Sequence, residues 1–203
     1  MPTVALVPVR SLADGKQRLA AVLSDRERCA LVRAMLEDVL DALARAAGIA
    51  ASLVVSGDTA VLPVAEAAGA ILLPDVPEGG LNASLQAASA WVAAALPGHA
   101  LLVVAGDLPV LTPALVESVV PAAKAEIVIA RSLDGGTNLL WQAPPLSLRF
   151  AFGVQSCTRH RTAALAAGRT VAVLEHPVLA RDLDTPDDLA ALLPLLRAGQ
   201  TMR

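Results

Sequence analysis

The sequence predicts an α/β protein built around a mostly parallel sheet. Short apolar runs alternate with longer helical stretches, and the early runs are continuously apolar, as expected for parallel strands covered on both faces. From about residue 131 the rhythm changes, because short strands follow one another without a long crossover helix. We therefore expect an antiparallel excursion there, within one domain that covers residues 1–203.

The elements follow from apolar runs and from capping signals. Strands are expected at residues 4–7, 53–56, 71–73, 101–105, 127–130, 139–141 and 171–174, with a further short strand around Phe150. Helices are expected at residues 24–47, 59–68, 81–96, 113–123, 156–167 and 186–197. Ser24 and Glu27 have the spacing of a capping box, and Gly48 can end that helix in a left-handed conformation. Thr112 and Thr185 each place a hydroxyl cap before a proline.

Composition excludes several classes of protein. The chain has 203 residues, 55% of them hydrophobic and 17% charged, which is enough for a buried core and rules out a disordered chain. A pI near 5.6 and 2% aromatic residues argue against a nucleic-acid partner. The apolar stretches end well short of the ~20 residues of a membrane span, and no basic segment precedes the first one. Cys29 and Cys157 lack ligand spacing, which suits a reducing compartment, so we expect a cytoplasmic protein.

The loop after the first strand is rich in cations. In an open α/β sheet, ligands bind at the carboxyl ends of strands. The loop that begins near Pro8 holds Arg10, Lys16 and Arg18, in a chain with only two lysines. A lysine in this place suggests a compact ammonium for a phosphate, and the alternative is an ordinary solvated loop. The spacing of a P-loop is absent.

Two further segments have the composition of anion sites. Gly79, Gly80 and Asn82 open the third helix, where they can present backbone N–H groups to a nucleotide or simply form a capped turn. The run from Gly153 into the helix that begins at Ser156, with Arg159 and His160 nearby, could hold a second anion. Its alternative is a serine cap with basic residues on the surface.

Three aspartates predict a metal site. Asp107 directly follows a buried strand, where a carboxylate can hold a divalent cation or only form a turn. Asp182 and Asp184, two residues apart, share one face if their segment is extended. Two like charges held together need a cation or strong donors. All three together suit a metal-dependent phosphoryl-transfer site. Zinc spacing and the elbow motif of serine hydrolases are absent.

These segments, in this order, resemble the 2-phospho-L-lactate guanylyltransferase family, which acts in biosynthesis of coenzyme F-420. Some members use phosphoenolpyruvate or 3-phosphoglycerate as acceptor. The resemblance covers nearly the whole chain and rests on the segments VPVRSLADGKQRLA, PEGGLNASL, GDLPVLTP, DGGTNLLW, FAFGVQSCTRH and RDLDTPDDL.

The resemblance implies a three-layer nucleotidyltransferase fold of the Rossmann-like, GT-A type and transfer of GMP from GTP to a phosphorylated carboxylic acid. The implied Mg²⁺ ligands are Asp107, Asp182 and Asp184; the implied acceptor residues are Thr137, Gly153 and Ser156; the implied nucleotide residues are Pro8, Arg10, Lys16, Gly80 and Asn82, with Asp107, Lys16 and Arg10 acting in catalysis. Arg10 stands where the family often has lysine, and Gly106 where it commonly has alanine.

Two alternatives stay open at this point. One is a molybdopterin- or sugar-phosphate-type nucleotidyltransferase, although those enzymes usually have a glycine-rich loop where this chain has proline and cations. The other is a non-catalytic nucleotide sensor, against which the three aspartates argue, since fold alone does not decide function. No residue separates the three candidate acids. The apolar helices could also bury a homodimer interface, which the sequence does not locate.

Overall fold

The computed structural model describes residues 1–76, 78–119 and 125–199. Within these residues one sheet has seven strands in the order β3-β2-β1-β4-β6-β5-β7. The strands are β1 Thr3–Pro8, β2 Ile49–Val55, β3 Ile71–Leu73, β4 Ala100–Val104, β5 Ile127–Arg131, β6 Thr137–Gln142 and β7 Val171–Leu174. All neighbouring pairs are parallel except those of β6, which runs antiparallel to β4 and to β5. The mostly parallel sheet and its antiparallel excursion are therefore confirmed.

The helices begin and end close to the predicted residues. They are α1 Asp25–Arg45, α2 Leu62–Ala67, α3 Gly80–Ala95, α4 Pro113–Val119, α5 Ser156–Ala166 and α6 Pro186–Gly199, with 3-10 turns η1 Gln17–Leu19 and η2 Thr59–Val61. The last part of the predicted helix 113–123, residues 120–123, lies outside the described residues. Ser24 and Glu27 form the predicted capping box. None of the described helices combines the length and apolar character needed to cross a bilayer.

The strand predicted around Phe150 is wrong. The backbone N–H of Phe150 donates to the Gln86 side chain on α3, at 3.3 Å, instead of joining a strand ladder. Its ring is buried beside α3 and α5, which explains the apolar signal in the sequence. A short apolar segment that packs under a helix therefore has the same sequence pattern as a strand.

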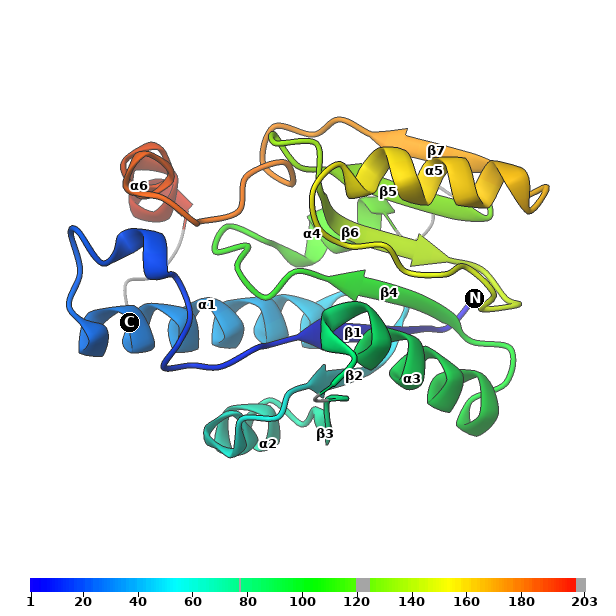
Figure 1. Ribbon diagram of the computed structural model, residues 1–203, viewed down its shortest axis with the longest axis horizontal. Coiled ribbons are helices and arrows are strands. Elements are labelled where there is room, and N and C mark those ends of the chain that lie inside the picture. The colour runs from blue at the N-terminus through cyan, green and yellow to red at the C-terminus, as the bar shows by residue number, and fades with distance from the viewer. Residues whose placement is uncertain (77, 120–124, 200–203) are drawn as a thin grey trace.

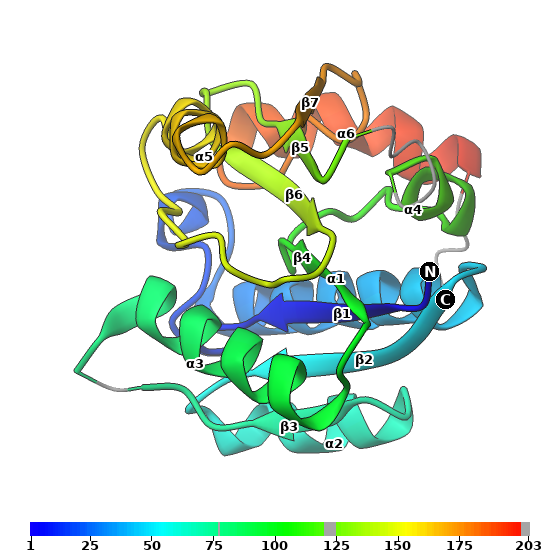
Figure 2. The ribbon, with the colours of Figure 1, turned by 90° about the vertical axis from the view of Figure 1, so that its right-hand side faces the viewer.

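Alternate residues of the strands build two cores. Ala5 and Val7 of β1 face the core that holds α1, α2, α4 and α6, whereas Val4 and Leu6 face the core that holds α3 and α5. Figure 2 shows α3 and α5 on one side of the sheet and α1, α4 and α6 on the other. The fold thus has three layers, and both faces of the sheet are covered.

The loops that carry the candidate residues meet at one edge of the sheet. The loop after β1, the loop after β4 and the segment before α6 come together on the left of Figure 1. Because β6 is antiparallel, its first residues, Thr137 and Asn138, lie at this same edge. One edge therefore collects residues from the ends of parallel strands and from the start of a reversed strand.

Candidate active site

A cavity of about 690 Å³ opens at this edge of the sheet. That volume suits a small-molecule site. It is lined by residues from the loop after β1, the start of α3, the end of β4, the β5–β6 turn, the start of β6, the loop before α5 and the segment before α6, among them Pro8, Arg10, Arg18, Gly80, Asp107, Asp134, Thr137, Asn138, Gly153, Ser156, Asp182 and Asp184.

Asp107, Asp182 and Asp184 form a carboxylate cluster at the cavity. Each offers one carboxylate oxygen, and these oxygens all lie within 4.8 Å of one another. Asp107 follows β4, and the other two lie on the segment before α6, where the backbone N–H of Leu183 donates to the carbonyl of Asp107 at 3.2 Å. This backbone bond ties the two segments together and so brings the three carboxylates to one place.

Lys16 neutralises part of the carboxylate cluster. Its ammonium lies 2.5 Å from a carboxylate oxygen of Asp107 and 2.5 Å from one of Asp184, and its side chain is only 8% exposed. Burial alone would lower the pKa of Lys16, but the two aspartates outweigh it and raise the pKa above its usual value. The sequence predicts this ammonium on a phosphate, whereas the structure places it on the carboxylates.

The carboxylate cluster fits a divalent cation. Burial first, then the charge of Asp107, raise the pKa of Asp182, so this carboxylate lacks compensation from its surroundings. Asn138 offers it one long contact of 3.5 Å. Carboxylate oxygens are the ligands that hard cations such as Mg²⁺ prefer, and a cation would relieve the mutual repulsion of the cluster.

Two residues beside the cavity have left-handed backbone conformations that are unusual for side-chain-bearing residues. Among the described non-glycine residues only Lys16, with φ 56°, and Gln155, with φ 55°, have a positive φ. Lys16 precedes η1, and Gln155 precedes α5. Such conformations cost on the order of 1–3 kcal/mol and concentrate at functional sites. Here they turn the Lys16 side chain toward the carboxylates and start α5 at Ser156.

Thr137 and Ser156 form a hydroxyl pair at the same cavity. The Ser156 hydroxyl donates to Thr137 Oγ1 at 3.1 Å, and both residues are at least 92% buried. Gly153 lies in the loop before α5. Its φ of +117° is a backbone conformation that favours glycine. The three predicted acceptor residues therefore line the same cavity, together with the carboxylate cluster.

The anion site predicted at the start of α5 is only partly open. The backbone N–H groups of Ser156 and Cys157 donate to the carbonyls of Gly153 and Gly135, at 3.0 and 3.3 Å. The basic character expected of His160 is wrong: the ring is fully buried, and burial lowers its pKa to about 4. His160 is therefore neutral near pH 7.

Of the five residues predicted for the nucleotide, Lys16 pairs with the carboxylate cluster, and the other four divide into two groups. Pro8, Arg10 and Gly80 line the cavity, and Gly80 needs its glycine because its φ is +63°. Asn82 is not among the lining residues. Its side chain accepts from the Phe152 N–H at 2.7 Å and donates to the Phe152 carbonyl at 3.1 Å, so it holds the loop before α5.

The comparisons with known proteins agree with this geometry. A family described as "Guanylyl transferase CofC like" matches residues 3–200. The chain belongs to this family.

Several relatives in this family are guanylyltransferases for phosphorylated acids. The chain is 39% identical over 200 residues to the phosphoenolpyruvate guanylyltransferase of Conexibacter woesei, which covers 97% of this chain and 89% of the relative. It is 42% identical over 188 residues to the 3-phospho-D-glycerate guanylyltransferase of Phenylobacterium zucineum, covering 91% and 86%. It is 35% identical over 195 residues to the 2-phospho-L-lactate guanylyltransferase of Methanothermobacter thermautotrophicus, covering 95% and 85%.

Solved structures show the nucleotidyltransferase fold. A nucleotidyl transferase from Methanothermobacter thermautotrophicus is similar with a TM-score of 0.65 at 18% identity, over 98% of this chain and 99% of the other. A cytidylyltransferase from Leptospira borgpetersenii is similar with a TM-score of 0.64 at 12% identity, over 99% and 89%. The three-layer nucleotidyltransferase fold predicted from the sequence is confirmed.

Sequence reasoning missed the role of Asn138 and gave His160 a different role from the one it has in the structure. Asn138 donates to the Leu179 carbonyl at 3.0 Å and contacts Asp182, which anchors the segment that carries two of the carboxylates. His160 contacts both the hydroxyl pair and the loop before α5. A signal for the contact of His160 with the hydroxyl pair was present, because His160 stands four residues after Ser156 and so shares a helix face with it.

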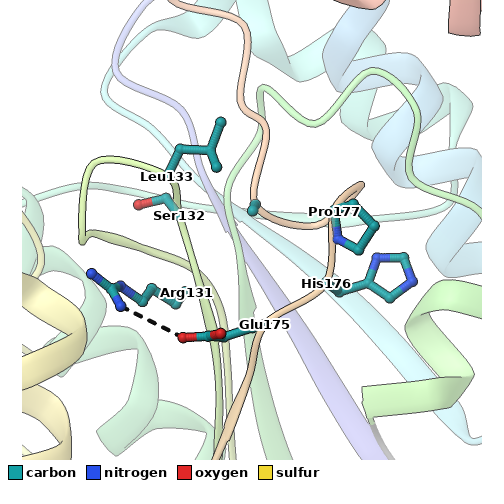
Figure 3. Close-up of a pocket in the computed structure, with 7 residues that line it drawn as sticks. Arg131, Ser132, Leu133, Glu175, His176 and Pro177 are labelled. Atoms are coloured by element: carbon teal, nitrogen blue, oxygen red, sulfur yellow. Dashed lines mark ion pairs between the residues drawn. The ribbon is translucent and has the colours of Figure 1, made fainter.

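A smaller cavity of about 360 Å³ lies beside the ends of β5 and β7. Figure 3 shows its lining, with the ion pair between Arg131 and Glu175, whose charged atoms are 3.6 Å apart. His176 accepts backbone hydrogen bonds from Val178 and Leu179. None of the residues predicted for the site lines this smaller cavity. Those predicted residues that line a cavity all line the larger one.

Proposed function

We propose that this protein transfers the guanylyl group of GTP to the phosphate of a small phosphorylated carboxylic acid, with release of pyrophosphate. A phosphate oxygen of the acceptor forms a bond to the α-phosphorus, and the bond between that phosphorus and the oxygen bridging to the β-phosphate breaks. The observation that carries the proposal is that the carboxylate cluster and the hydroxyl pair face one cavity in a CofC-family chain.

The carboxylate cluster would hold Mg²⁺. When bound, the ion supplies charge neutralisation at the triphosphate. The residues of the chain contribute the oxygen ligands of Asp107, Asp182 and Asp184, and Lys16 fixes two of these carboxylates and balances their charge. The alternative use of this cluster, a structural ion pair with Lys16 alone, would leave Asp182 without compensation for its burial.

The cations at the cavity would bind the triphosphate. Arg10 lines the cavity, is exposed, and has no ion-pair partner among the described residues. Arg18 is 76% exposed and lies 3.9 Å from Asp184. An exposed guanidinium group with no partner, as at Arg10, or with one long contact, as at Arg18, can make paired hydrogen bonds to phosphate oxygens. Of the two glycines at the start of α3, Gly79 already donates its N–H to the Val76 carbonyl at 3.0 Å, so the backbone group on the nucleotide side would be that of Gly80, which lines the cavity.

The hydroxyl pair would bind the acceptor acid. Hydroxyl and backbone N–H groups recognise a carboxylate without placing a competing charge beside the carboxylate cluster. The acceptor phosphate is already ionised near neutral pH, so the reaction needs positioning and charge neutralisation rather than a strong general base. This agrees with a cavity wall in which the nearest histidine is buried and neutral.

The experiment measures pyrophosphate release from GTP and Mg²⁺ with 2-phospho-L-lactate, phosphoenolpyruvate or 3-phospho-D-glycerate, each beside a control without acceptor. We expect release that depends on one of the three acids and stops when a chelator is added. No release with any of them, from folded protein that still binds GTP, would overturn the proposal and favour the nucleotide sensor. Participation in coenzyme F-420 biosynthesis and a cytoplasmic location belong to this same proposal.

A pair of variants separates the metal assignment from the fold. Asp182→Asn removes one ligand of the carboxylate cluster, and Asp187→Asn removes an exposed aspartate from the first turn of α6 at the same change in net charge. We expect transfer to be lost in the first variant and kept in the second.

A further inference from the structure

His160 belongs to a connected set of hydrogen bonds that ends at the cavity. The backbone N–H of Ala151 donates to His160 Nε2 at 2.9 Å, and His160 Nδ1 lies 3.2 Å from Thr137 Oγ1. Ser156 then donates to the same oxygen of Thr137 at 3.1 Å. The ring is fully buried, and the Phe152 ring packs against it edge to face with centroids 4.7 Å apart.

The directions of the two hydrogen bonds made by the His160 ring follow from the backbone. A backbone N–H can only donate, so His160 Nε2 must be the unprotonated, accepting nitrogen. Burial in an apolar setting, with the charge of Arg159 adding to it, lowers the pKa of His160 to about 4, so the ring is neutral near pH 7. The single ring proton therefore sits on Nδ1, and Nδ1–H donates to Thr137 Oγ1.

This arrangement leaves one hydroxyl proton for a ligand. Thr137 Oγ1 accepts from His160 and from Ser156, so both of its acceptor positions are used. Because Ser156 is the donor of the bond between the two hydroxyls, the Thr137 proton is left without an acceptor among the described residues, and Thr137 lines the cavity. With the opposite ring tautomer, Nδ1 would accept the Thr137 proton, and the hydroxyl pair would have no proton to offer.

We propose that His160 is a positioning residue that fixes the hydroxyl pair in its donating orientation, so that Thr137 donates into the cavity to an anionic oxygen of the acceptor acid. This inference rests on the proposed function, because it assigns the Thr137 proton to that acceptor. His160 also contacts Ala151, in the segment before Gly153, as well as Thr137 of β6. The same side chain therefore sets the position of the hydroxyl pair and of the loop that carries Gly153.

A matched pair of variants tests the Nδ1–H donor. His160→Asn places an amide N–H group near the position of Nδ1, whereas His160→Gln keeps an acceptor near the position of Nε2 and loses the donor. We expect His160→Gln to raise the KM for the acceptor about 10-fold, as for one lost hydrogen bond, and His160→Asn to stay within about 3-fold of wild type. The KM for GTP should stay within about 2-fold in both.

A residue that only filled the core would give another result. Both variants would then lose thermal stability and leave the KM for the acceptor unchanged, or would change both KM values alike. Either outcome, with active wild type, overturns the role of His160 alone. Absence of transfer by the wild type with all three acids would overturn the proposed function and this inference with it.

A second measurement does not depend on activity or on a folded variant. Long-range ¹⁵N–¹H correlation spectra of the wild-type protein at pH 7 show which ring nitrogen of each histidine carries the proton, and the chain has three histidines. We expect the His160 proton on Nδ1. A proton on Nε2, or a doubly protonated ring, would overturn the inference. As a further check, Thr137→Val should remove the effect of His160→Gln, because the two changes break the same hydrogen bond.

Discussion

The two walls of the cavity are built from different chemistry. The carboxylate cluster is charged and partly open to solvent, with side-chain exposures of 28% for Asp107 and 42% for Asp184. The hydroxyl pair and His160 are uncharged, and none of these three residues is more than 8% exposed. The charged wall depends on partners that screen its repulsion, whereas the uncharged wall is held by its own hydrogen bonds and keeps one hydroxyl proton for a ligand. The charged wall should therefore control the rate of transfer, and the uncharged wall the binding of the acceptor.

The largest effect is expected from Asp182→Asn. Loss of a metal ligand should lower kcat at least about 1,000-fold, on the order of 4 kcal/mol of transition-state stabilisation. The free energy of unfolding should not fall, because burial and Asp107 already raise the pKa of this carboxyl and make its charged form unfavourable. Steady-state kinetics and chemical denaturation measure the two quantities, with Asp187→Asn as control. Near-normal turnover would remove Asp182 from the metal site.

Lys16→Met should remove the ammonium group that balances the charge of the carboxylate cluster. In chelator we expect the variant to lose about 2 kcal/mol of stability, less than for a fully buried pair because Asp184 is 42% exposed. Millimolar Mg²⁺ should restore most of this loss, since a cation replaces the missing ammonium. Arg18→Met is the control and should cost less than about 0.5 kcal/mol, as its side chain is 76% exposed. A loss that Mg²⁺ leaves unchanged would mean that Lys16 acts through packing.

The uncharged wall should respond to pH instead. The pKa of His160 is about 4 in the folded protein and near 6.5 when unfolded, so the unfolded state takes up the proton first as the pH falls. The stability from neutral His160 is present above pH 6.5 and is lost as the pH falls toward 4. Between pH 7 and pH 5 this amounts to about 2 kcal/mol. His160→Gln should lack this part of the pH dependence in urea unfolding, and identical slopes for variant and wild type would contradict it.

The smallest effect is expected from Asn82→Ala. Removing both hydrogen bonds to the Phe152 backbone should cost about 1 kcal/mol of stability and raise the KM for the acceptor about 3-fold. The KM for GTP should hardly change, because Asn82 of α3 holds the loop before α5, which lies on the acceptor side of the cavity. If the KM for GTP rose instead, Asn82 would belong to the nucleotide side, as the sequence resemblance implies.

The sequence predicted the charged wall well for a physical reason. Continuous apolar runs mark parallel strands, and the carboxyl ends of parallel strands lie at the same edge of the sheet. Asp107, which follows one of these strands, is therefore expected near the loops that follow the others. Asp182 and Asp184 carried their own signal, because two like charges two residues apart need compensation. That Lys16 would supply part of it was not predictable, since it depends on a left-handed backbone at Lys16 and on residues 91 and 168 positions away.

The uncharged wall was less accessible to sequence reasoning. Its residues are held by contacts between distant segments, such as Asn82 with Phe152 and His160 with Ala151. The strand predicted around Phe150 failed for the same reason, because its backbone hydrogen bond goes to a side chain of α3. Residue type and local spacing predict where charged side chains gather. They do not predict which distant backbone group a side chain will hydrogen-bond.

An irregularity in the pairing of β5 with β6 explains how both walls can meet on one strand. Ala130 pairs with Leu139 but Arg131 pairs with Thr137, which leaves Asn138 as a bulge. Simple alternation would place Thr137 on the face of Leu139, yet it contacts α5, while Asn138 reaches Leu179 on the other face.

The length of the chain at this bulge thus specifies the cavity as directly as the identity of its residues. Deletion of one residue of the turn 132–136, with Ala130 still paired to Leu139 and the bulge lost, would restore alternation and exchange the faces to which the Thr137 hydroxyl and the Asn138 amide point, with no new side chain introduced. Turns between strands tolerate changes in length better than the strands themselves. A single insertion or deletion in this turn can therefore change which side chains face the acceptor side of the cavity while the strands stay paired.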